Sequence, residues 1–228
     1  MIMINSDINN TRIEVIILKK FILFFTLVAM LAISSIVSAY ENEPNGFRNL
    51  TWGMTYDEAA KIYPNNTNVS EYSYQLADFQ IPYLDIFSFT IDNPFVYDIP
   101  IENTLVACFY KNKLYSITLK FTNINDFATF SKNQEHLNTQ LRNLYGNPTY
   151  MLKHLIIPEE ETIHTNYSWF GKNTNIFALA QYNLFIDSTK CPDCLTLVFT
   201  SVDINNEMLS DQLQSYQDYQ YYYNSYNN

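Results

Sequence analysis

Two cysteines that lie close together in the sequence are the residues best placed to do chemistry. Cys191 and Cys194 form a C-x-x-C motif around Pro192 and Asp193, a spacing found in redox couples, in halves of zinc sites and in structural disulfides. A redox motif places its first cysteine at a helix N-terminus, where the helix dipole lowers the thiol pKa. Here the strand-like run Leu195–Phe199 follows directly, so the motif is a poor candidate for redox catalysis.

A zinc site needs further ligands beyond the two cysteines of this motif. The sequence offers them only as dispersed residues: Cys108, His136, His154 and His164. The ends of a four-residue turn lie within about 7 Å of each other, which suits the Cα separation of a disulfide. We predict a local disulfide between Cys191 and Cys194, while free thiols, a metal site and a redox role stay as alternatives. Cys108, on a strand, is expected to be a small core residue.

The remaining polar residues form no recognisable catalytic pattern. His154 and His164 have no serine or cysteine pattern beside them in the sequence, although a catalytic triad can assemble from distant segments. The acidic run Glu159–Glu161 lacks the alternating oxygen ligands of a calcium loop. We therefore assign no catalytic, cofactor-binding or metal-ligating residue, and we expect no cofactor. A hydrolase site built from these two histidines and the acidic loop is the alternative.

The N-terminus has the pattern of an export signal. The basic pair Lys19-Lys20 precedes the uncharged run Phe21–Ala39, which ends in small residues typical of a cleavage site. Cleavage there makes Tyr40 the first residue, and the absence of a cysteine at that point argues against a lipid anchor. The alternative is an uncleaved anchor, since the apolar run is nearly long enough to span a bilayer. We predict a signal peptide over residues 1–39, a periplasmic or extracellular protein, and no stable membrane anchor after cleavage.

Charge and composition restrict the partners and the number of domains. The formal net charge of −10 at pH 7 repels phosphate backbones and anionic lipids, so nucleic acid is not expected as a partner. Residues 40–204 are long enough for one domain with a core of its own. Residues 205–228 end in a low-complexity tail of Tyr, Gln, Asn and Ser. We expect a short helix around Asn206–Gln217 and fraying beyond it.

The run FRNLTWGMTYDE predicts a short helix and the turn that leads into it. Thr55 and Glu58 match the T-x-x-E capping box, which predicts a helix over residues 56–62. Gly53 permits a tight turn before this helix. Trp52 is then expected to fold against the helix.

Alternating apolar residues predict a β-hairpin around the polar turn Lys111–Lys113. One face of its first strand carries Leu105, Ala107 and Phe109. On the return strand, four residues are expected to share one face: Tyr115, Ile117, Leu119 and Phe121.

A stripe of apolar residues at helical spacing predicts a long helix after the hairpin. Asp126 is the expected N-cap, and Gly146 followed by Pro148 is the expected stop. The stripe consists of Phe127, Phe130, Leu137, Leu141, Leu144 and Tyr145.

Five further strand-like runs complete the pattern, over residues 85–91, 150–157, 165–170, 175–186 and 195–202. Between the first helix and the first of these runs, the polar segment NNTNVSEYSY is expected to be a loop. With only four glycines, the chain has no glycine-rich phosphate loop. We predict an α+β two-layer sandwich, with a mostly antiparallel sheet of five or six strands and two helices on one face.

The run Phe47–Ala59 resembles the opening of a loose group of small exported bacterial domains, which reads F-R-x-hydrophobic-x-W-G-M-[ST]-x-x-E-hydrophobic. These domains continue with a hydrophobic hairpin, a helix ending in Y-G-x-P, a tryptophan and a further strand. Their places are taken here by Phe109–Ile117, Tyr145–Pro148, Trp169 and Asn175–Leu179.

The Gly53-Met54-Thr55 helix start is also similar to the repeat of the β-lactamase inhibitor protein and to small outer-membrane assembly lipoproteins, which present a sheet or loop surface to a protein partner. The chain departs from the lipoproteins in lacking the lipidation cysteine. The resemblance implies an exported, non-catalytic binding protein and transfers no active site.

We therefore expect an exported binding or assembly module whose partner is an unknown protein or envelope component. Two alternatives remain: an extracytoplasmic hydrolase with a site near His154 and His164, and a metal or redox role of the Cys191–Cys194 turn. The residues expected to shape the fold are Trp52, Gly53, Thr55, Glu58, Gly146, Pro148 and Trp169.

Overall fold

The computed structural model describes residues 40, 42–70, 82–122, 126–157, 162–183 and 194–226, with the backbone alone for 153–157, 183 and 215–226. Every element below belongs to the unit Ala39–Asn228. The predicted signal peptide lies outside the described residues. Within the described residues, no helix is long and apolar enough to cross a membrane.

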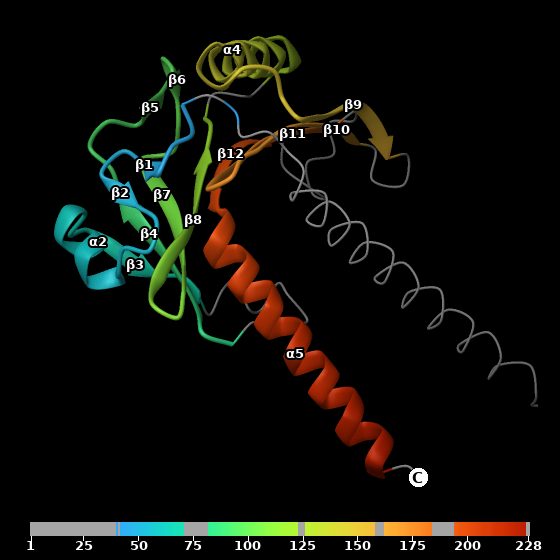
Figure 1. The fold of residues 1–228 in the computed structure, drawn as a ribbon. Helices are drawn as coiled ribbons and strands as arrows, with labels where there is room; N and C mark the ends of the chain where they lie inside the picture. Colours follow the sequence, from blue (N-terminus) through green and yellow to red (C-terminus); the bar gives the residue numbers. More distant parts are fainter. Residues whose placement is uncertain are drawn as a thin grey trace, which may run out of the picture. The chain divides into compact units, whose positions relative to one another are not determined.

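An eight-stranded antiparallel sheet forms the centre of the fold, with the strand order β3-β4-β7-β8-β12-β11-β10-β9 (Figure 1). In chain order its strands are β3 (Asn66–Asn68), β4 (Leu84–Thr90), β7 (Thr104–Tyr110), β8 (Lys113–Lys120), β9 (Tyr150–Ile157), β10 (Thr162–Phe170), β11 (Thr174–Asn183) and β12 (Cys194–Ser201). Two small ribbons pair β1 (Gly46–Phe47) with β2 (Leu50–Thr51) and β5 (Phe95–Val96) with β6 (Ile99–Pro100). The helices are α2 (Tyr56–Ile62), α4 (Phe127–Tyr145) and α5 (Val202–Tyr226).

The predicted α+β class and antiparallel pairing are confirmed, whereas the predicted five or six strands are too few. Strand β3 accounts for part of the difference. It lies in the polar segment predicted to be a loop and pairs with β4 at the sheet edge. Because β3 is an edge strand of three polar residues, it lacks the apolar alternation that identifies a strand in sequence.

The two faces of the sheet carry separate buried clusters: the two predicted helices share one face, while a third helix packs on the other, so the predicted two-layer sandwich is not confirmed. The main cluster includes Ala59 of α2 and Leu137 of α4. A smaller cluster includes Ile204 and Met208 of α5 together with Tyr110 of β7. Since Tyr110 alternates along β7 with Phe109 of the main cluster, α5 packs on the opposite face from α2 and α4.

The turn of the β7–β8 hairpin is one residue shorter than the predicted turn Lys111–Lys113. The hairpin also contains a β-bulge. Lys111 and Asn112 form the turn, both with positive φ (49° and 59°), as a two-residue type I′ turn requires. The register shifts between Cys108 and Phe109. Because of this shift, Leu114 joins the main cluster and Tyr115 joins the smaller one. The prediction that Tyr115 shares a face with Ile117 is therefore wrong.

The W-G-M-T run forms the predicted turn and helix cap. The Thr55 side chain accepts a hydrogen bond from the Glu58 amide, and the Glu58 carboxylate accepts one from the Thr55 amide at 2.9 Å, so the capping box is confirmed. Gly53 has φ +80° and donates its N–H to the Leu114 carbonyl at 2.9 Å. Trp52 donates its indole N–H to Thr174 Oγ1 at 2.7 Å. The turn thus ties α2 to β8 and β11.

Replacing Gly53 with alanine is expected to lower the free energy of unfolding by about 1 kcal/mol, because an L-residue at positive φ is strained. No atom lies within 4 Å of the position that the new Cβ would occupy, so the effect isolates backbone strain from crowding. Urea denaturation measures it. Lys61→Ala, at an exposed position of α2, serves as the control. Equal stability of Gly53→Ala and wild type would contradict the role of this turn.

Helix α4 has the predicted ends but a narrower buried stripe than predicted. Asp126 Oδ1 accepts a hydrogen bond from the Thr129 amide at 2.9 Å, and the helix ends at Gly146 with φ 75°. Phe130, Leu137 and Leu141 are buried. Phe127 and Leu144 are 53% and 40% exposed, so their predicted place in the stripe is wrong.

A short N-terminal segment is bound into the fold at the α4 end of the sheet. Tyr40 donates its hydroxyl to the Thr174 carbonyl at 2.8 Å, and its ring contacts Tyr145 edge-on at 5.5 Å between centroids. Glu43 accepts hydrogen bonds from the amides of Asn173 and Thr174 at 2.5 and 2.7 Å. Burial, with a smaller effect of Glu43, raises the pKa of Tyr40 well above its ordinary range. The first described residues are thus part of the folded domain.

Helix α5 is longer than predicted. It starts at Val202, directly after β12, and runs to Tyr226, whereas the sequence predicted a helix only around Asn206–Gln217. The segment for which we expected fraying is helical as far as Tyr226.

Candidate functional site

The sheet face that carries α5 also holds apolar side chains that belong to neither buried cluster. Residues directly opposite in an antiparallel pair share a face. The register therefore places Val106, Thr118, Val198, Phe177 and Ser168 in one row across five strands. The neighbouring row contains Lys120, Thr196, Leu179 and Asn166. We call these nine residues, together with Phe170, the open face.

The open face mixes apolar surface with hydroxyl and amide groups. Its apolar members, Val106, Phe170, Phe177, Leu179 and Val198, are each half-buried. Phe170 and Phe177 contact each other edge to face, with 5.9 Å between ring centroids. Ser168 donates its hydroxyl to Asn166 Oδ1 at 3.0 Å. Such a surface offers dispersion contacts and hydrogen bonds, with Lys120 as its one charged group, and these are the contacts of a protein interface.

Helix α5 borders the open face and is fixed by its first turns. Ile204 and Met208 pack against Leu84, Tyr110 and Tyr115. This packing covers the end of β4, β7 and β8 at the hairpin turn.

An ionic cluster fixes α5 to the hairpin turn. Lys111 Nζ lies 2.6 Å from Asp211 Oδ2 and 3.2 Å from Glu207 Oε1, and Lys113 Nζ lies 3.1 Å from Glu207 Oε2. Tyr110 donates its hydroxyl to Asp211 at 2.6 Å. We call these five residues the α5 clamp.

The clamp shifts the titration of its own members. Hydrogen bonds from Lys111 and then Tyr110 lower the pKa of Asp211, and those from Lys113 and Lys111 lower the pKa of Glu207. The two carboxylates raise the pKa of Lys111. Desolvation, with the Asp211 hydrogen bond, raises the pKa of Tyr110 to about 12. All four shifts favour the protonation states present at neutral pH.

Cys108 lies beside α5, on the same sheet face. It packs against the smaller buried cluster, and burial raises its pKa to about 12. Because the thiolate is the reactive form of cysteine, this residue is held as an unreactive thiol. The prediction that Cys108 is a small packed residue agrees with this placement.

At the margin of the open face, the strand register places three polar residues in one row, although they lie far apart in the sequence. His164 of β10 is directly opposite Gln181 of β11, and Gln181 is directly opposite Cys194 of β12. His164 Nε2 lies 2.8 Å from Thr162 Oγ1, and Thr162 is fully buried. The Gln181 amide nitrogen is buried and has no hydrogen-bond partner. We call His164, Gln181 and Cys194 the margin row.

The predicted disulfide is not formed among the residues that the structure describes, where Cys108 is a free thiol. Cys191 lies outside those residues, so its pairing with Cys194 stays a prediction. The side chain of His154 and the acidic run Glu159–Glu161 also lie outside them. The structure therefore leaves the predicted hydrolase grouping untested.

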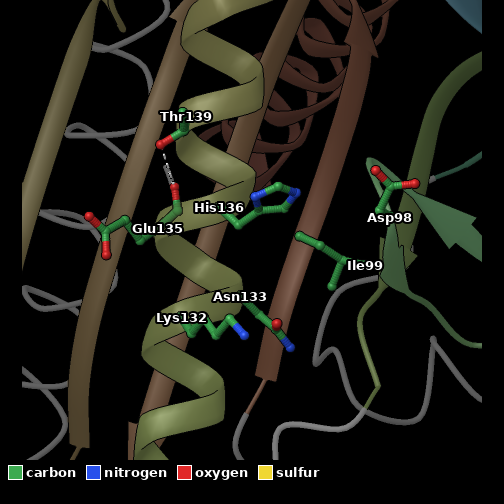
Figure 2. A pocket seen from close by; sticks show the side chains of 7 residues that line it. All are labelled: Asp98, Ile99, Lys132, Asn133, Glu135, His136 and Thr139. Atoms are coloured by element: carbon green, nitrogen blue, oxygen red, sulfur yellow. Dashed lines mark hydrogen bonds between the residues drawn. The ribbon is translucent and has the colours of Figure 1, made fainter.

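A groove of about 480 Å³ lies between α4 and the turn of the β5–β6 ribbon. Figure 2 shows the seven residues that line it: Asp98, Ile99, Lys132, Asn133, Glu135, His136 and Thr139. His136 points toward Asp98 and Ile99, whereas Glu135 points away from both (Figure 2). His136 Nε2 lies 2.9 Å from the Tyr97 carbonyl, and this histidine is half-buried.

The charged groups of this groove do not form a compact set. Asp98, Lys132 and Glu135 are exposed, so solvent screens them from one another. Among the described residues, no group of three or more His, Cys, Asp or Glu side chains could hold a metal ion. The groove therefore supplies weaker support for a function than the open face does.

These observations define the fold class alone: an α+β protein with helices on both faces of an antiparallel sheet. No protein-family model, curated protein or solved structure matches the chain.

Proposed function

We propose that this protein is an exported, non-enzymatic binding or assembly module that binds a protein partner on the open face. The observation that supports this most directly is the apolar part of that face. Val106, Phe177 and Val198 follow one another in register across the sheet and belong to neither buried cluster. Apolar surface that the core does not use marks interaction sites.

The charge of the chain narrows the kind of partner. The net charge of −10 opposes nucleic acid and anionic lipid, while the open face itself carries a single ionised side chain, the exposed Lys120. The partner surface is therefore apolar at its centre, with Lys120 as the one charge that it faces. The leader-like residues 1–39 support a periplasmic or extracellular location, and N-terminal sequencing of exported protein, with Tyr40 expected first, tests this part.

Affinity capture with matched variants tests the proposed binding face. Phe177→Glu with Val198→Glu places two charges on the open face and is expected to abolish recovery of the partner from native envelope extracts. Lys132→Glu, in the groove, makes a similar change of charge elsewhere and is expected to leave recovery intact. Equal recovery by wild type and the open-face variant would contradict the proposal, provided that circular dichroism shows both variants folded.

An extracytoplasmic hydrolase is the second candidate, because of one contact. Thr162, fully buried, holds the imidazole of His164 in a fixed orientation, as an orienting residue does for a catalytic base. Turnover of ester or peptide probes that disappears in His164→Ala, while partner capture persists, would favour this candidate over the binding module.

A further inference from the structure

We infer that the β9 edge of the sheet is the interface of a symmetric homodimer, in which β9 pairs antiparallel with β9 of a second copy of the chain. Among the described residues, β9 pairs with β10 alone and is the last strand of the sheet (Figure 1). The inference does not depend on the proposed binding function. It rests on the length of this edge, on the apolar side chains exposed there and on the symmetry of the strand.

The β9 edge offers backbone hydrogen-bonding groups to a further strand. Every second residue of an edge strand directs its N–H and C=O away from the sheet, and β9 is eight residues long. Strand β3, at the opposite edge, has only three residues, all polar. Short edge strands resist pairing with another chain. Association through β9 alone therefore stops at two chains, because the β3 edges do not extend it.

Two apolar side chains of β9 are exposed, one on each face of the sheet. Tyr150 is directly opposite Ser168 of the open face, and Met151 is directly opposite Tyr167 of the main cluster. Tyr150 is 36% exposed and Met151 is 45% exposed. A partner that packs on one face could cover only one of these side chains. A strand added at the edge covers both, one on each side.

A β-bulge makes the apolar pattern of β9 symmetric about the centre of the strand. The register with β10 shifts between His164 and Asn166, so Lys153 and His154 together oppose one residue. The residues on either side of the bulge therefore repeat the same order of faces in reverse. By register, the side of the open face has Tyr150, Leu152, Leu155 and Ile157, and the side of the main cluster has Met151 and Ile156.

This symmetry favours a second copy of the chain over a strand of another protein. A two-fold axis perpendicular to the sheet, between residues 153 and 154, brings Leu152 opposite Leu155 of the second copy. The same axis brings Met151 opposite Ile156 of the second copy. Opposite residues of an antiparallel pair share a face, so apolar positions meet apolar positions on both faces. An isologous interface requires such self-complementarity, whereas pairing with a foreign strand does not.

The size and charge of the interface set its expected strength. Strand β9 contributes fewer residues than the 20–30 that a standard interface takes from each side. Each copy has a net charge of −10, and β9 contains no acidic residue, so repulsion comes from the rest of the chain. We therefore expect a dimer that dissociates on dilution and becomes tighter as added salt screens this repulsion.

Sedimentation velocity of the full chain over a range of concentrations tests the dimer. The wild type is expected to pass from monomer to dimer and to form no larger species. Met151→Lys places a charge at the edge, opposite Ile156 of the second copy, and symmetry introduces the charge twice. A cost of about tenfold at each copy raises the dissociation constant about 100-fold. Tyr150→Lys makes the same change on the other face and should have the same effect.

Two matched controls place the same charge away from β9. Leu213→Lys changes an apolar residue of α5 that is 51% exposed, and Thr67→Lys changes an exposed residue of the β3 edge. Both should leave the dissociation constant unchanged. Because all of the substituted positions are exposed, circular dichroism should show a folded chain in every variant.

Hydrogen exchange gives a second readout that does not depend on mass. Protection over residues 150–157 should rise with concentration in the wild type and stay low in Met151→Lys. A chain that stays monomeric, a dimer that either β9 variant leaves intact, or growth beyond the dimer would overturn the inference. Partner capture by Met151→Lys, whose open face is unchanged, tests the binding module separately.

Discussion

Trp169→Ala is expected to lower the free energy of unfolding by about 3–5 kcal/mol, the cost of removing a large aromatic side chain from a core. Trp169 is fully buried in the main cluster. It also donates its indole N–H to the Gly146 carbonyl at 2.9 Å, at the C-terminal end of α4. The substitution therefore opens a cavity and releases the end of that helix. Urea denaturation followed by circular dichroism measures the loss.

Trp169→Phe is the matched control, because it keeps an aromatic ring and removes the N–H donor. We expect a smaller loss, of about 1–2 kcal/mol, from the missing hydrogen bond and the reduced volume. The fluorescence of Trp52, the other tryptophan of the chain, follows unfolding in both variants. A Trp169→Ala protein as stable as Trp169→Phe would show that the ring does not support this core.

Lys111→Glu is expected to release α5 from the sheet while the sheet stays folded. The lysine bridges Asp211 and Glu207, so a glutamate there faces two carboxylates of like charge. Hydrogen exchange should show loss of protection in residues 202–214 and retained protection in β11 and β12. Lys61→Glu, at an exposed position of α2, makes the same charge change away from the clamp and should have no such effect.

A charge swap tests whether the effect of Lys111→Glu is electrostatic. Lys111→Glu combined with Asp211→Lys restores one pair of opposite charges and should recover much of the protection. If the double variant is as unprotected as the single one, packing at this position, and not charge, holds the helix.

Acid should release α5 in the wild-type protein as well. The pKa values of Asp211 and Glu207 are lowered in the folded state, so their contribution is complete above the ordinary carboxyl range and is lost as the pH falls through the lowered folded values. Helix α5 should therefore stay docked at pH 7 and lose protection below about pH 4. Asp211→Asn should remove most of this pH dependence.

Local patterns in the sequence were sufficient to predict the elements whose structure is decided by neighbouring residues. The Thr55–Glu58 capping box and the Asp126 cap form as predicted, because capping is decided within one turn of helix. Strand β9 has the predicted limits. Elements set by distant contacts were predicted less well: β3 is a strand because β4 lies beside it, and the Cys108–Phe109 bulge moves Tyr115 to the other face.

The candidate sites could be predicted only in part, for the same reason. The sequence drew attention to Cys194 and His164 separately, but nothing in their spacing relates them to each other. Their relation exists only through Gln181, in the register of three strands. The open face likewise depends on which side of the sheet α5 occupies, a choice made by the packing of Ile204 and Met208.

The N-terminal segment constrains the order in which the domain can be completed. Tyr40 and Glu43 bind Thr174, from which they are separated by 134 and 131 positions in the chain. The ribosome synthesises Tyr40 and Glu43 well before the β10–β11 turn that leads into Thr174. These contacts therefore cannot form until most of the polypeptide has been synthesised. They wait for the β10–β11 turn, and truncation before residue 174 should leave the beginning of the domain untethered.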